Sequence, residues 1–220
     1  MVTREKIETT YIDYVLTEGS QPKSVYVFVK KLKMTESDFY KFFASFDALE
    51  ESIWKDFGSV VIDEIKAQEV WASYSAREKA LSFFYAFFEM LRGHRSYADY
   101  SLKNAPRRLI TPRVFQGLRD LFLNFSDEII NEGLESGELS DRKYFAKRYK
   151  DGLWAQFVFL LHFWVRDDSP DFEKSDEAIE KGVNLTFDLF QRSPIDNLLE
   201  YGKFLAQNSQ MKEFLNFSGF

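Results

Sequence analysis

Apolar residues recur every three or four positions along most of this chain, which is the spacing of helices that bury one face. No segment shows the sustained alternation of apolar and polar residues that is typical of a half-buried strand. We therefore predict an all-α fold. The expected helices span about residues 4–18, 24–32, 47–68, 76–92, 112–134, 143–167, 174–192 and 195–207, and a further short helix opens at Thr35.

The first 47 residues differ from the rest in helix length and in charge. They hold three short helices and seven acidic against seven basic residues, so the whole net charge of −6 lies beyond them. We predict two domains: a three-helix unit over residues 1–47 and a larger helical bundle over residues 48–220.

Composition excludes several classes of function. The 220 residues include no cysteine and only two histidines, His94 and His162, and they contain no glycine-rich phosphate loop. We expect no enzyme activity, no catalytic residues, no metal site and no cofactor. The strongest apolar run covers nine residues, 157–165, where a membrane-spanning helix needs roughly 20. The first residues lack the apolar run of a signal peptide, so we expect none. We expect no stable membrane insertion and a cytoplasmic location.

Three short helices with a tight break between the second and the third form the plan of a helix-turn-helix unit. In that plan the second helix lies against the DNA backbone and the third enters the major groove. The break would be at residues 33–35, among Lys30, Lys31, Lys33 and Lys41. Lysines, hydroxyl groups and helix N-termini are the groups that contact phosphates, so this segment is a candidate DNA-binding surface.

The same segment resembles the TetR family of bacterial transcription regulators over about residues 3–54. The matching elements, in order, are Thr3-Arg4-Glu5-Lys6-Ile7, Gly19, Ser24-Val25, Phe28-Val29-Lys30, Met34-Thr35, Phe39-Tyr40-Lys41-Phe42-Phe43 and Ala48-Leu49. The resemblance implies a homodimer that binds a double-stranded DNA operator and is released by a small ligand. The predicted DNA-binding residues are Ser24, Lys30, Lys31, Lys33, Thr35, Ser37, Tyr40 and Lys41.

Three departures from the family pattern leave an alternative open. Lys33 stands where the family usually has a turn glycine, Glu36 places a carboxylate near the DNA phosphates, and Phe46 replaces a lysine that commonly contacts phosphate. The alternative is a TetR-like protein that has lost DNA binding and keeps its bundle as a module that binds lipids or other hydrophobic molecules.

The helix expected at 143–167 is apolar nearly all round, which indicates burial on several sides. One stripe holds Phe157, Leu160 and Trp164, while Phe159 and Phe163 project from the opposite side. We predict a dimer interface formed by the first stripe together with a stripe of the following helix: Phe157, Leu160, Trp164, Val183, Phe187 and Phe190. A purely intramolecular core is the alternative.

A second group of aromatic residues is a candidate ligand pocket, because small-molecule sites are mostly apolar. Its predicted members are Phe84, Phe87, Phe88, Phe122, Phe125 and Trp154. The same spacing also fits a plain core. The preferred hypothesis is a homodimeric repressor that is released from DNA when this pocket binds a small hydrophobic ligand such as a lipid.

Overall fold

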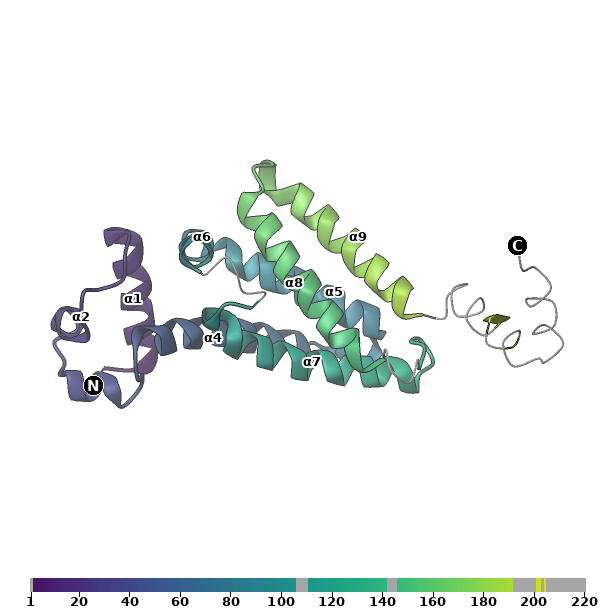
Figure 1. The fold of residues 1–220 in the computed structure, drawn as a ribbon, viewed down its shortest axis with the longest axis horizontal. Helices are drawn as coiled ribbons and strands as arrows, with labels where there is room; N and C mark the ends of the chain where they lie inside the picture. The colour runs from purple at the N-terminus through teal and green to yellow at the C-terminus, as the bar shows by residue number, and fades with distance from the viewer. Residues whose placement is uncertain (1, 106–110, 142–145, 192–200, 203, 205–220) are drawn as a thin grey trace, which may run out of the picture.

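The computed structural model describes residues 2–105, 111–141, 146–191, 201, 202 and 204, and this part of the chain contains helices and no strand. The all-α prediction is confirmed. Figure 1 shows three short helices at one end of the long axis, and the longer helices packed beside one another next to them. The helices are α1 (Arg4–Glu18), α2 (Val25–Lys31), α3 (Glu36–Tyr40), α4 (Phe46–Lys66), α5 (Ala76–Arg92), α6 (Arg95–Asn104), α7 (Gln116–Glu135), α8 (Tyr149–Arg166) and α9 (Glu173–Phe190).

The three short helices, which we call the head, enclose a small aromatic core. Phe28 of α2 makes edge-to-face ring contacts with Tyr11 of α1 and Phe39 of α3, at centroid distances of 5.9 and 6.2 Å. Phe46, the first residue of α4, lies 5.5 to 5.8 Å from the rings of all three. Aromatic side chains bury much apolar area per residue, so four rings can stabilise a unit of this size.

Helix α4 connects the head to the larger bundle, which we call the body. The Ser45 hydroxyl accepts a hydrogen bond from the Ala48 N–H at 3.1 Å and caps the helix. The helix then runs away from the head and packs against α5 and α7 (Figure 1). The predicted domain boundary at residue 47 falls in the first turn of this continuous helix, and the division into two domains stays a prediction.

Phe157 of α8 lies at the centre of the body core. Its ring contacts rings of α5 and α7 and the ring of Trp154 on its own helix, with centroids 5.0 to 6.2 Å apart. The aromatic rings around it are those of Phe83, Phe84, Phe87, Phe88, Phe122 and Trp154. Six of the 24 phenylalanines in this chain therefore belong to a single cluster between α5, α7 and α8.

Helix α6 was not predicted from the sequence. Its residues are mostly polar, and no side chain caps its N-terminus, so periodicity and capping give little signal. Tertiary contacts hold it instead: Tyr97 and Ala98 are fully buried. The Arg95 guanidinium donates hydrogen bonds to the backbone carbonyl oxygens of Trp164 and Asp167, at 2.9 and 2.8 Å, where α8 ends. A cation at that position also complements the helix dipole.

Other helix ends differ modestly from the prediction. The described part of α8 starts at Tyr149, and the helix opened by Thr35 ends at Tyr40. The predicted helix over 195–207 falls almost entirely outside the described residues. Helix ends depend on capping and tertiary contacts more than on apolar periodicity, which explains shifts of a few residues.

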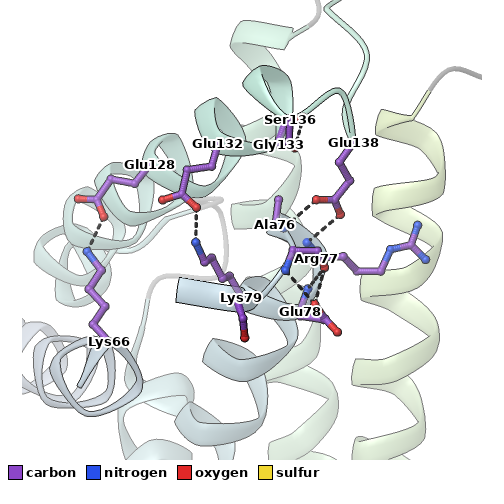
Figure 2. Close-up of polar contacts among 12 residues, drawn as sticks. Lys66, Ala76, Arg77, Glu78, Lys79, Glu128, Glu132, Gly133, Ser136 and Glu138 are labelled. Atoms are coloured by element: carbon purple, nitrogen blue, oxygen red, sulfur yellow. Dashed lines mark hydrogen bonds and ion pairs between the residues drawn. The ribbon is translucent and has the colours of Figure 1, made fainter. Parts of the chain in front are cut away.

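The turn that follows α7 is fastened to the start of α5, as Figure 2 shows. The Glu138 carboxylate accepts hydrogen bonds from the backbone N–H groups of Ala76 and Arg77, at 2.8 and 3.1 Å. Gly133 allows the close approach, because a Cβ there would lie 2.8 Å from the Leu139 side chain and 3.0 Å from the Ala76 Cβ. Glu138 therefore satisfies two of the N–H groups that a helix N-terminus leaves unpaired.

Replacing Glu138 with alanine is expected to destabilise the protein by about 1–2 kcal/mol, because two hydrogen bonds to a charged acceptor at a helix N-terminus are lost. Urea unfolding followed by circular dichroism measures the change. Glu135→Ala, which removes an exposed carboxylate at the end of α7, is the control and should change stability by less than about 0.5 kcal/mol. Equal effects of the two substitutions would contradict the capping role.

None of the helices in the described part of the chain combines the length and hydropathy needed to cross a membrane. The same residues bring together no group of three or more histidine, aspartate or glutamate side chains that could hold a metal ion.

Candidate nucleic-acid interface

The turn between α2 and α3 is formed with a lysine where a glycine would be easiest. Lys33 has φ of 53°, in the left-handed region that costs a non-glycine residue roughly 1–2 kcal/mol. Two backbone hydrogen bonds close the turn, from the Lys33 N–H to the Lys30 carbonyl at 3.3 Å and from the Met34 N–H to the Val29 carbonyl at 3.2 Å. The chain therefore makes the turn without the family's usual glycine, and the Lys33 side chain is exposed there.

Two of the three serine and threonine residues predicted to contact DNA are helix caps. The Ser24 hydroxyl accepts from the Val27 N–H at 3.3 Å, and the Thr35 hydroxyl accepts from the Asp38 N–H at 3.2 Å. The Asp38 carboxylate in turn accepts from the Thr35 N–H and hydroxyl, which completes a capping box. Both caps leave the N-terminus of their helix at the surface, where backbone N–H groups can also meet a phosphate.

The lysines of the surface differ in how they are paired. Lys31 lies 3.6 Å from Glu18, and Lys41 lies 2.7 Å from Asp38. Hydrogen bonds from Lys41 and Thr35 lower the pKa of Asp38 to about 2, so that this carboxylate stays charged. Within the described residues, Lys30 and Lys33 form no ion pair. Lys30 lies over the ring of Tyr26 at 4.3 Å, a contact that keeps its charge exposed.

All eight predicted DNA-binding residues are exposed on α2, α3 and the turn between them. Tyr40 is the largest, with 53% of its surface accessible, whereas the neighbouring Phe39 is fully buried in the head core. Glu36 is also exposed, at the start of α3. The surface therefore combines hydroxyl groups, an aromatic ring, four lysines and the carboxylate of Glu36, which forms no ion pair with the part of the chain that the structure describes. Its contact with DNA stays a prediction.

Phe46 belongs to the head core and not to this surface. Its ring stacks on Tyr11 and meets Phe28 and Phe39 edge to face. The lysine that the family commonly places at this position is therefore replaced by a packing residue, which removes one expected phosphate contact.

The six residues predicted to form a dimer interface lie in the core of their own chain. Phe157, Leu160, Trp164, Val183, Phe187 and Phe190 are at most 9% exposed, so in this arrangement they pack inside their own chain, and their part in a dimer stays a prediction. The large apolar side chains of the same two helices that are exposed are Phe159 (64%), Phe163 (36%), Leu185 (61%) and Leu189 (52%). The stripe chosen from the sequence is thus the inward one, because the helices α8 and α9 turn their most continuous apolar face toward α5 and α7.

The six residues of the predicted ligand pocket all lie in the hydrophobic core of the chain. Phe84, Phe122 and Trp154 meet ring to ring, and all six are at most 3% exposed. Phe88 lines a cavity of about 350 Å³, together with Tyr85, Trp164 and Phe172. Ligand binding among these rings stays a prediction, and it requires that some of them move apart.

Comparison with known proteins agrees with this arrangement. A family model described as "Tetracyclin repressor-like, C-terminal domain" matches residues 79–205, more than half of the chain. No curated protein gives a significant match.

Three solved structures share the fold. A structure from Shewanella sp. PV-4, assigned to the tetR family of transcription regulators, is 16% identical with a TM-score of 0.61 and covers 88% of this chain and 100% of its own. A protein of unknown function from Rhodococcus sp. RHA1 is 15% identical with a TM-score of 0.55, covering 86% and 95%. A regulatory protein of the tetR family from Rhodococcus RHA1 is 15% identical with a TM-score of 0.52, covering 86% and 97%.

Proposed function

Because this chain belongs to the TetR family of transcription regulators, we propose that it is a homodimeric repressor that binds double-stranded DNA through its head and is released by a small hydrophobic ligand. The observation that carries the proposal is the exposure of all eight predicted contact residues on α2, α3 and their turn. A repressor acts where the DNA is, so the proposal includes a cytoplasmic location.

Binding to DNA would use the two helices in different ways. Tyr40 and Ser37 of α3 would enter the major groove, while the N-terminus of α2, with Ser24, would contact the backbone. Lys30 and Lys33 can meet phosphates without first giving up an acidic partner among the described residues. Lys31 and Lys41 would have to exchange Glu18 and Asp38 for phosphate, which reduces their net gain.

Dimerisation would use the outward face of α8 and α9. Phe159 and Phe163 of α8 and Leu185 of α9 form an exposed apolar surface on two helices that lie side by side (Figure 1). Two copies related by a two-fold axis would bury this surface in a four-helix interface. Successive half-sites on one side of DNA are about 34–36 Å apart, which is the spacing the two heads would need.

Ligand control would follow from a difference in ligand affinity between two arrangements of the heads. A ligand that binds better to the arrangement that does not fit the operator lowers operator affinity, and operator lowers ligand affinity by the same factor. The predicted site among Phe84, Phe87, Phe88, Phe122, Phe125 and Trp154 belongs to this proposal.

The second candidate function is a hydrophobe-binding protein without DNA binding. It is favoured by the exposed carboxylate of Glu36, which lies next to the α3 residues that are predicted to enter the DNA major groove. An anion at that position repels the DNA phosphates. The pairing of Lys31 and Lys41 with acidic residues weakens the basic surface in the same direction.

The purified full chain is expected to select a DNA sequence from the region flanking its own gene or from a random-sequence pool. Fluorescence anisotropy at several salt concentrations measures the affinity. Lys30→Ala with Lys33→Ala should weaken binding by about 10–100-fold and lower the salt slope by about 2, because two phosphate contacts are lost. Lys174→Ala, on α9, is the control and should leave both values unchanged. No selective, salt-sensitive binding would contradict the repressor and favour the second candidate.

A further inference from the structure

A groove of about 490 Å³ lies where the head meets the body, between α1, α4 and the end of α5. Its walls are mainly apolar and come from all three helices: Ile12 from α1, Phe57 and Val60 from α4, and Met90 from α5. Val60 is 50% exposed there, so part of this apolar wall is open to solvent. The groove is therefore an apolar surface shared by the head and the body.

One end of the groove is polar, and Arg4, the arginine among its lining residues, is hydrogen-bonded to neighbouring side chains. The Arg4 guanidinium donates to the two carboxylate oxygens of Asp56, at 2.8 and 2.7 Å, to the Ser52 hydroxyl, and to Glu8 Oε1 at 3.2 Å. Ser52 also donates to Glu8 Oε1, at 2.9 Å. An anionic ligand at these lining residues would therefore have to compete with Asp56 and Glu8 for the Arg4 guanidinium.

The same end carries an excess of negative charge. The lining residues include three carboxylates, those of Glu5, Glu8 and Asp56, and one guanidinium, that of Arg4. Burial lowers the pKa of His94, which lines the groove from the body side, so this imidazole adds no positive charge at neutral pH. Burial also raises the pKa of Glu8, in spite of its bonds from Ser52 and Arg4. A cation next to Glu8 would offset the free-energy cost of burying its charged carboxylate.

We propose that this groove is a binding site for an amphiphilic amine, with its apolar part against Phe57, Val60 and Met90 and its ammonium group beside Glu8 and Glu5. Charge complementarity selects the amine over a carboxylic acid, and the apolar walls select it over a small polar cation. In the body core, by contrast, the rings around Phe157 are packed against one another.

An occupant of this groove would influence the position of the head. Ile12 and Glu8 move with α1, whereas Met90 and His94 belong to the body. A molecule that touches both sets binds most tightly in one arrangement of head and body and stabilises that arrangement. This consequence rests on the proposed function, because it uses DNA binding as its readout. The binding site itself does not.

The binding test uses n-octylamine, n-octanol and octanoate with the full-length protein in the absence of DNA, measured by isothermal titration calorimetry. Octylamine is expected to bind at least about tenfold more tightly than octanol, and octanoate should show no binding. Glu8→Gln should remove the advantage of the amine and leave octanol unchanged. Equal affinity of the three compounds would overturn the proposed site. An octylamine affinity that is the same in the wild-type protein and in Glu8→Gln would also overturn it.

A second variant keeps the test independent of the Arg4 network. Val60→Lys puts an ammonium group of the protein into the groove from an exposed position, and it should abolish octylamine binding while the fold is retained. Val70→Lys, at an exposed valine outside the groove, is the matched control and should bind octylamine normally. Octylamine binding that survives Val60→Lys in a folded protein would place the amine elsewhere and overturn the inference.

The coupling is tested with the operator found for the proposed function. Octylamine should change the operator affinity of the wild-type protein at least about threefold and that of Val60→Lys not at all. An amine that binds in the groove without changing operator affinity would overturn the coupling. Absence of DNA binding before any amine is added would instead contradict the proposed function, so the two failures are distinguishable.

Discussion

Introducing glutamate at both Phe159 and Leu185 is expected to convert the proposed dimer into folded monomers. These side chains are 64% and 61% exposed on the outward faces of α8 and α9, so the monomer fold does not depend on them. Four carboxylates in a two-fold interface would be desolvated and would repel one another. Sedimentation velocity measures the change in mass.

The same variant should lose operator affinity by at least about 100-fold, because a monomer binds one half-site without the effective concentration that a linked second head provides. Val70→Glu, at an exposed valine of the segment between α4 and α5, is the matched control and should remain dimeric and bind DNA. A double variant that stays dimeric would contradict this face as the interface.

Phe157→Ala is expected to have the largest effect on stability, a loss of about 3–5 kcal/mol, because it leaves a cavity among closely packed rings. The Phe157 ring lies 5.0 Å from Phe87, 5.5 Å from Phe122 and 5.2 Å from Trp154. Guanidinium unfolding measures the loss. The comparison is cleanest in the monomeric Phe159→Glu, Leu185→Glu background, where dissociation and unfolding are no longer linked.

Phe163→Ala in the same background is the control, since this ring is partly exposed on the outward face and should contribute less than about 1 kcal/mol to the monomer. In the otherwise wild-type chain, Phe157→Ala should leave the protein dimeric below its unfolding transition. Dissociation with little loss of stability would show that Phe157 lies at the interface, as its apolar stripe suggested.

Much of the fold is predictable because helices depend on local features. The spacing of Ile7, Tyr11 and Val15 indicates the buried face of α1, and Thr35 with Asp38 indicates where α3 begins. α6 is the exception, since Tyr97 and Ala98 are buried by neighbours that are far away in the sequence. Local patterns carry no information about such neighbours.

The candidate DNA surface was recognisable from the sequence for a similar reason. Ser24, Lys33 and Tyr40 lie within 17 consecutive residues, so their order along the chain nearly sets their arrangement. The groove at the head was not recognisable, because Glu8, Phe57 and Met90 come together only when α1, α4 and α5 are packed.

By itself, the sequence determined the helical architecture, the short helices of the head and the residues that the head presents to solvent. Only the tertiary structure decided which aromatic residues are core and which are surface. Helix α8 is apolar on nearly all sides, so periodicity could not distinguish Phe157, which is fully buried, from Phe159, which is 64% exposed. The physical reason is that apolar spacing reports how much of a helix avoids water, whereas the neighbour that covers each face is chosen by packing between helices distant in the sequence.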